Sequence, residues 1–291
     1  MNHSVHSISA LRAKSGSEGM MGRMLVELGK LTPEEVEQVL RLQQETDMRF
    51  GEAACYLSLI TDEDVRQVLA RQFDYPCLQP GASGLPAELV AGYLPFSPEV
   101  EALRKIRSLL LLHWFDAGRK ALAVMCVDSG DGASFFNANL AVVFAQLGKQ
   151  TLLVDANLRR PRQHRIFHIH GGKGLSDLLA GRAGADPVAE IAAFPCLSVL
   201  PAGTMAPNPQ ELIGHDAFRL AIDGMSPRFD VILVDVPACA AVSDALAVAA
   251  RVGGVLLVVR KNKTRLADIA AVNTQLAHSR IQVVGSVLID F

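Results

Sequence analysis

The chain has 291 residues, half hydrophobic and a fifth charged, so it can bury the core of one large domain or of two unequal domains. Its formal net charge of −2 gives no reason to expect nucleic acid as a partner. The five cysteines are scattered and form no CxxC pair, which favours reduced thiols over a metal site, and no apolar run approaches the roughly 20 residues of a membrane span.

The N-terminal part of the chain predicts a tail followed by a small helical domain. Residues 1–18 are polar and serine-rich, lack the apolar core of a signal peptide and predict a mobile tail. Residues 20–72 contain an internal repeat with an offset of 29 residues. Each copy has a short amphipathic segment, a threonine that can cap a helix (Thr32 or Thr61) and a second helix. Two such units can bury their apolar stripes against each other, so we expect a helical docking or regulatory domain over residues 19–78.

This repeat resembles the tandem motif in the N-terminal domain of type II secretion and pilus ATPases, some of which bind cyclic di-GMP. The ligand-binding version opens each copy with an Arg-Leu-Gly-like triplet. The second copy keeps such a triplet at residues 49–51, whereas the first has Met20 in place of the arginine, a lost bidentate contact to phosphate or guanine. One hypothesis places cyclic di-GMP contacts at Arg49, Gly51 and Gly22. The other is a docking module or folded spacer without this ligand.

A linker and a charged helix are predicted next. Residues 79–98 are rich in proline and glycine, which is typical of a linker. Glu101, Arg104 and Arg107 then follow at spacings of three, which would place them along one helix face. On its own, this spacing is typical of a solvated face with internal ion pairs.

From Lys120 onward, apolar strands alternate with helices. Strands are predicted at residues 121–127, 151–155, 197–200, 231–235, 254–260 and 283–289, and helices at 135–147, 209–225, 243–250 and 265–278. Near-continuous apolar strands joined by helices predict an α/β domain with a doubly wound, mostly parallel sheet, which we place at residues 99–291. Ligands bind at the carboxyl ends of the strands of such a sheet.

The first predicted strand leads through a glycine turn, residues 128–134, into a helix. This is the setting of a phosphate loop, or Walker A loop, in which backbone N–H groups and the helix N-terminus bind phosphate. Ser134 stands where such a loop places its magnesium-binding hydroxyl, but Ala133 occupies the position of its lysine and Val127 that of its first glycine. A tight turn without a ligand would look similar. The predicted nucleotide contacts are Ser129, Gly130, Asp131, Gly132, Ala133, Ser134 and Phe135.

Acidic residues end two further strands, Asp155 and Asp235. A hydroxyl and strand-end carboxylates are usual holders of Mg²⁺ in phosphoryl transfer, so Ser134, Asp155 and Asp235 are the predicted metal ligands. The two acids are also the predicted catalytic residues, with Asp155 accepting a proton from an attacking hydroxyl or binding the ion through water. Either acid alone would be as well explained as a helix cap, but two acids beside a glycine loop favour a site.

In combination, these motifs resemble the bacterial tyrosine kinases of polysaccharide export (BY-kinases), including the chain-length-determinant kinases of exopolysaccharide operons. The resemblance covers residues 95–291 and is carried by residues 129–134, 139–148, 153–155, 158–164, 174–176, 200–203, 207–212 and 235–237. It implies a P-loop fold, ATP and Mg²⁺ as cofactors, and transfer of phosphate to protein tyrosine. It also implies a cytoplasmic protein that an integral-membrane chain-length regulator recruits to the inner face of the membrane. Glu101, Arg104 and Arg107 then correspond to the motif that packs the family's subunits into a homo-oligomeric ring.

The chain departs from the family pattern at the loop lysine, which is Ala133, and at a second acid, which is Asn157. The family's C-terminal tyrosine cluster also has no counterpart here, so we expect no autophosphorylation of a tail. A charged donor to the transferring phosphate is typically worth on the order of 10²–10³ in rate. We therefore expect nucleotide binding with weakened phosphoryl transfer, unless a cation such as Arg159, Arg160 or Arg162 replaces the lysine.

Two alternatives stay open. One is a non-enzymatic pseudokinase scaffold that sets polymer length through ring assembly. The other is a positioning ATPase of the MinD/ParA kind, which would need a lysine where this chain has Asp128.

Overall fold

The chain forms two compact units, Met1–Pro76 and Cys77–Phe291. The computed structural model describes residues 18–72, 75–78, 84–184, 186–214, 216–239 and 244–290. The predicted tail, residues 1–18, lies outside the described residues except for Glu18, which begins the first helix.

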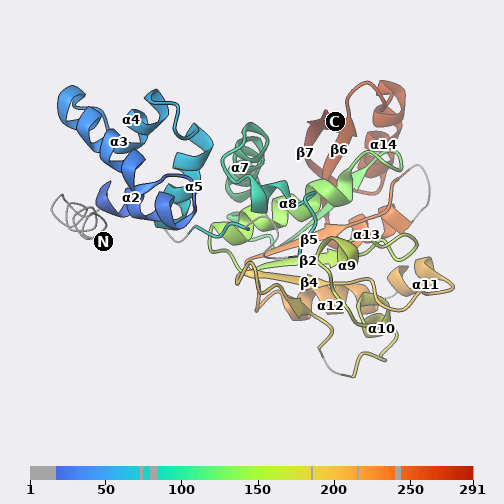
Figure 1. Ribbon diagram of the computed structural model, residues 1–291. Coiled ribbons are helices and arrows are strands. Elements are labelled where there is room, and N and C mark those ends of the chain that lie inside the picture. Colours follow the sequence, from blue (N-terminus) through green and yellow to red (C-terminus); the bar gives the residue numbers. More distant parts are fainter. Residues whose placement is uncertain are drawn as a thin grey trace. The chain divides into compact units, whose positions relative to one another are not determined.

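The first unit contains two pairs of helices that follow the sequence repeat. They are α2 (Glu18–Glu27), α3 (Pro33–Thr46), α4 (Phe50–Tyr56) and α5 (Asp62–Gln72) (Figure 1). Thr32 accepts a hydrogen bond from the backbone N–H of Glu35, and the Glu35 carboxylate accepts one from the N–H of Thr32. Thr61 and Asp64 form the same capping box in the second copy. Each copy therefore starts its second helix at the threonine that the sequence indicates.

Each copy also turns between its helices through a residue with positive φ. Gly29 has φ +65° in the first copy, and Ser58 has φ +56° at the equivalent position of the second. Their N–H groups donate to the carbonyls of Val26 and Cys55, at 2.9 and 2.8 Å. Glycine adopts this left-handed conformation at little cost, whereas a residue with a Cβ is strained. The second turn therefore carries a residue that its backbone disfavours.

The second unit is built on a seven-stranded sheet in the order β3-β4-β2-β5-β1-β6-β7. The strands are β1 (Ala121–Cys126), β2 (Thr151–Asp155), β3 (Ala189–Glu190), β4 (Leu197–Leu200), β5 (Val231–Asp235), β6 (Gly254–Arg260) and β7 (Gln282–Ile289). Every neighbouring pair is parallel except β3 and β4. The mostly parallel α/β fold is thus confirmed. The two-residue β3 escapes prediction because it is too short to show a pattern.

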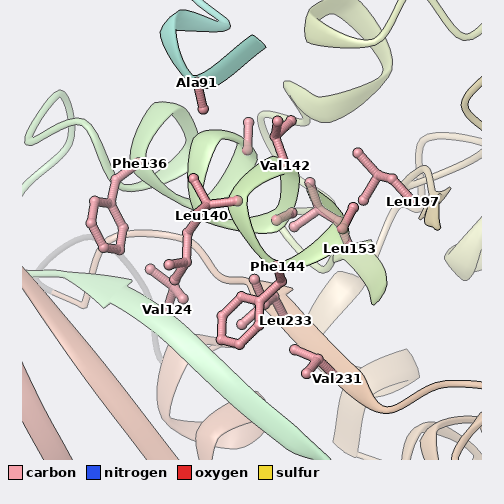
Figure 2. Packing of buried hydrophobic residues seen from close by; sticks show 14 of the residues in the cluster. Ala91, Val124, Phe136, Leu140, Val142, Phe144, Leu153, Leu197, Val231 and Leu233 are labelled. Atoms are coloured by element: carbon pink, nitrogen blue, oxygen red, sulfur yellow. The ribbon is translucent and has the colours of Figure 1, made fainter. Parts of the chain in front are cut away.

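Helices cover both faces of this sheet. They are α6 (Val90–Tyr93), α7 (Pro98–Leu110), α8 (Ala133–Gln146), α9 (Gln163–Ile166), α10 (Leu175–Leu179), α11 (Pro209–Gly214), α12 (Asp216–Met225), α13 (Asp244–Val252) and α14 (Leu266–His278), with a π-helical turn, η1 (Leu111–Phe115), after α7. Successive strand residues enter two different cores, as Val124 and Met125 do. Figure 2 shows Phe144 of α8 against Val231 and Leu233 of β5. The single helix predicted at 209–225 is two helices, the first of which ends at Gly214.

Of the segment predicted as a linker, residues 79–83 lie outside the described residues, and residues 84–98 pack within the second unit. Leu89 and Ala91 are fully buried in the core around α8. Ala91 lies across α8 from the sheet (Figure 2). The amide of Asn139 in α8 accepts from the N–H of Ala91 at 2.8 Å and donates to the carbonyl of Glu88 at 2.9 Å. Residues 84–98 therefore cover a helix that would otherwise expose apolar side chains to water.

Candidate functional site

The glycine turn lies at the carboxyl end of β1 and leads directly into α8. Gly130 and Gly132 have φ +86° and +88°, in the region that only glycine enters readily. Ala133 begins α8, and Ser134 follows it in the first helical turn. The loop thus has the strand–turn–helix setting expected of a phosphate loop.

A buried carboxylate in the loop sets its conformation. The Asp131 side chain is fully buried and accepts from the backbone N–H of Asp128 at 3.0 Å. It also accepts from the hydroxyl of Thr264 at 3.1 Å and pairs with Lys263 at 2.9 Å. A buried carboxylate needs such partners because its desolvation is costly. Asp131, which we predicted as a nucleotide contact, is thus a structural residue of the loop in this arrangement.

The segment after β6 supports the loop from outside. Lys263 donates to the carbonyl of Ser129 at 2.9 Å, and Arg260 donates to the carbonyl of Gly130 at 3.1 Å. Sequence reasoning missed Arg260, Lys263 and Thr264. All three follow the carboxyl end of β6, which pairs with β1, and this position in the sequence could have indicated a role at the site.

The two predicted acids lie side by side, since Asp155 of β2 and Asp235 of β5 are register partners. Both are fully buried. Asp155 accepts from three backbone N–H groups, those of Asn157 at 3.2 Å and of Arg162 and Gln163 at 2.9 Å.

Asp235 lies within reach of the phosphate loop. The Gln163 side-chain amide donates to Asp235 at 2.7 Å and to the backbone carbonyl of Ser134 at 3.1 Å. The fold therefore brings Ser134, Asp155 and Asp235 together at one edge of the sheet.

Burial raises the pKa of both carboxyl groups. For Asp155, burial and then the charge of Asp235 raise the pKa well above the ordinary value. Burial also raises the pKa of Asp235, although the hydrogen bond from Gln163 favours its charged form. The pair therefore holds protons at a higher pH than two separate surface carboxylates would.

One oxygen of the pair is open to a cation. Among the described residues, no donor reaches the buried Oδ1 of Asp235. Carboxylate and hydroxyl oxygens are the hard ligands that Mg²⁺ prefers. Ser134 and Asp235 thus fit a magnesium ion, with Asp155 beside them.

A pocket of about 750 Å³ opens beside the loop, within the range of small-molecule sites. Gly130, Gly132, Ala133 and Ser134 line one part of it. Another part is lined by four arginines from the segment after β2: Arg159, Arg160, Arg162 and Arg165. The pocket therefore joins a glycine loop to a strongly cationic surface, an arrangement suited to a polyanion.

The predicted oligomerisation residues all lie on α7. Glu101 forms an ion pair with Arg104 one turn later, and the Arg104 guanidinium lies 5.7 Å from the centre of the Phe96 ring. Arg107 donates to the carbonyl of Val143 in α8 at 2.9 Å. These contacts lie within the chain, and the ring-forming role stays a prediction.

The predicted cyclic di-GMP contacts divide into two groups. Gly22 and Gly51 are buried, and a Cβ at these positions would lie 3.2 Å from Phe50 and 3.0 Å from Val65, respectively. Close helix packing thus accounts for both glycines and leaves them covered. Of the three, only Arg49 is exposed to solvent.

Among the described residues, no helix combines the length and the apolar character needed to cross a membrane.

No family model matches the chain, but comparison with known proteins finds several relatives that are all bacterial tyrosine-protein kinases. It is 37% identical over 199 residues to a putative tyrosine-protein kinase EpsB of Ralstonia solanacearum, covering 68% of this chain but 26% of that protein. It is 31% identical over 194 residues to the putative tyrosine-protein kinase CapB of Staphylococcus aureus, covering 67% of this chain and 85% of that protein. The kinase domain of the Escherichia coli tyrosine kinase ETK superposes with a TM-score of 0.67 at 28% identity, covering 72% of this chain and 81% of that one.

Proposed function

The chain belongs to the family of bacterial tyrosine-protein kinases. We therefore propose that residues 99–291 bind Mg-ATP and transfer its terminal phosphate to protein tyrosine at a reduced rate. We place this activity in exopolysaccharide chain-length control and export. The observation that carries the proposal is the convergence of Ser134, Asp155 and Asp235 beside the glycine loop.

Each residue has a distinct task in this proposal. The N–H groups of the loop and the N-terminus of α8 bind the nucleotide phosphates. Ser134 and Asp235 would hold Mg²⁺, which would supply positive charge to offset that of the phosphates. Asp155 is oriented by its three backbone N–H donors and accepts the proton of the tyrosine hydroxyl.

A pseudokinase scaffold is the second candidate, and Ala133 is the observation that favours it. This residue offers no charge to the transferring phosphate, which costs on the order of 10²–10³ in rate. A MinD-like ATPase ranks below both, since Asp128 stands where its additional lysine is needed.

The remaining proposals concern assembly. A cytoplasmic protein of this kind would be recruited to the inner face of the membrane by an integral-membrane chain-length regulator, and Glu101, Arg104 and Arg107 would contribute to a ring. The helical unit would act as a docking module, with Arg49 available if it binds cyclic di-GMP.

Calorimetric titration with ATP in the presence of Mg²⁺ tests the binding proposal. We expect the native chain to bind ATP, and Ser134→Ala to bind it about tenfold more weakly because the ion loses a ligand. Lys261→Ala, which removes an exposed pair with Asp290 at 2.7 Å, is the control that should bind as the native chain does. The proposed site would be contradicted if the native chain and both variants gave the same heat of ATP binding with and without Mg²⁺.

A further inference from the structure

The arginine-lined wall of the pocket carries an inference that rests on the proposed function. We propose that Arg160 and Arg165 hold the terminal phosphate of ATP in place of the lysine that the loop lacks. Their role is to bind and position this phosphate in the pocket that Ala133 also lines. The charge that the lysine would supply during transfer is still missing, so transfer stays weakened.

The first support is the charge of the pocket. Arg159, Arg160, Arg162 and Arg165 line the same pocket as the glycine loop. The described residues that line it include no Asp or Glu. A surface lined by several cations attracts anions. The pocket therefore favours a ligand with several negative charges.

The second support is that two of the four arginines are already committed. Arg159 makes two hydrogen bonds to the buried carboxylate of Asp244, at 2.6 and 3.3 Å. Arg162 pairs with Glu88 at 2.8 Å. These pairs hold the segment after β2 in place, so the segment presents its other side chains from a fixed backbone.

Arg160 and Arg165 differ from these two. All four are exposed, but the described part of the chain contains no ion pair for Arg160 or Arg165. Burial and then the charge of Arg165 lower the pKa of the neighbouring His164. An incoming phosphate would supply the missing counter-charge.

The chemistry of the guanidinium group indicates which part of the nucleotide is involved. A loop lysine reaches the β- and γ-phosphates, so its absence leaves the terminal phosphate with the least support. Arginine binds phosphate through two parallel hydrogen bonds and stays charged at any physiological pH. Two such side chains would distinguish ATP from ADP, because ADP lacks the group they hold.

The test compares the binding of Mg-ATP and Mg-ADP to the full chain by calorimetry. The double variant Arg160→Ala/Arg165→Ala should bind ATP about tenfold to a hundredfold more weakly, the effect of losing hydrogen bonds to a charged group. Its affinity for ADP should change by less than about twofold. Arg219→Ala removes another exposed arginine, paired with Asp223 on α12 at 3.2 Å, and should change neither affinity.

Adding Ala133→Lys to the double variant should restore ATP binding, since the lysine would again reach the terminal phosphate. The inference is overturned if the double variant binds ATP as the native chain does, or if ATP and ADP weaken equally. In both cases the native chain still binds nucleotide, and the proposed function stands. A native chain that binds neither nucleotide would overturn the proposed function and the inference with it.

Discussion

At the scale of single residues, the carboxylate pair makes stability depend on pH. The pKa of Asp155 is raised in the folded chain by burial and by Asp235. The folded state therefore keeps a proton that the unfolded state releases near its ordinary pKa of about 4. The contribution of Asp155 to folding stability is fully present below the pKa of the unfolded state. It is lost as the pH rises through the raised pKa of the folded state.

We accordingly expect the melting temperature without Mg²⁺ to fall between about pH 5 and pH 9. Mg²⁺ should restore it more at the upper end of that range, because an ion held by Ser134 and Asp235 would offset the negative charge that the lost proton leaves. Scanning calorimetry with and without Mg²⁺ measures both effects. A melting temperature that rises with pH over this range would contradict the raised pKa.

A second residue-scale prediction concerns Lys263. Replacing it by alanine leaves the fully buried Asp131 without its cation, and we expect a loss of about 2 kcal/mol in the free energy of unfolding. Lys261→Ala is a matched control two residues away, because its pair with Asp290 is exposed and should contribute less than about 1 kcal/mol. Urea unfolding measures the free energy of unfolding of both variants. Equal losses would argue against stabilisation of the loop by Lys263.

At the scale of elements, the two helix pairs of the repeat allow an internal comparison. Ser58→Gly should stabilise the first unit by about 1 kcal/mol, because it removes a side chain from a left-handed residue. Gly29→Ser should destabilise it by a similar amount, although no atom lies within 4 Å of the added Cβ. Thermal unfolding of the two variants measures the difference. Changes of the same sign in both would contradict the equivalence of the turns.

The strands and the repeat could be predicted because each depends on local sequence. Continuous apolar runs identified β1, β2 and β5, and their carboxyl ends identified Asp155 and Asp235. The support from Lys263 could not be predicted, because strand order decides that β6 neighbours β1 and no local pattern records it. The packing of residues 84–98, part of the predicted linker 79–98, could not be predicted for a related reason. Their proline and glycine content is typical of linkers, whereas their packing depends on Asn139 in a distant helix.

At the scale of the whole molecule, the position of residues 84–98 determines where the nucleotide-binding unit begins. A fragment of residues 77–291 should fold and bind ATP as the full chain does, since all the site residues and their core lie within it. A fragment of residues 99–291 loses Leu89 and Ala91 and leaves the buried amide of Asn139 without two partners. We expect it to be at least about 3 kcal/mol less stable, as judged by urea unfolding. Equal stability of the two fragments would show that the segment is a linker after all.

The central claim is a tyrosine-kinase site that binds ATP but lacks one catalytic cation. The most direct test is a phosphotyrosine assay with Mg-ATP on the native chain and on Ala133→Lys, with Ala133→Lys/Asp155→Asn as the control for site-dependent transfer. We expect little phosphotyrosine from the native chain, an increase on the order of 10²-fold with the lysine, and none in the control. Equal yields from the native chain and Ala133→Lys would contradict the claim that the missing lysine limits transfer.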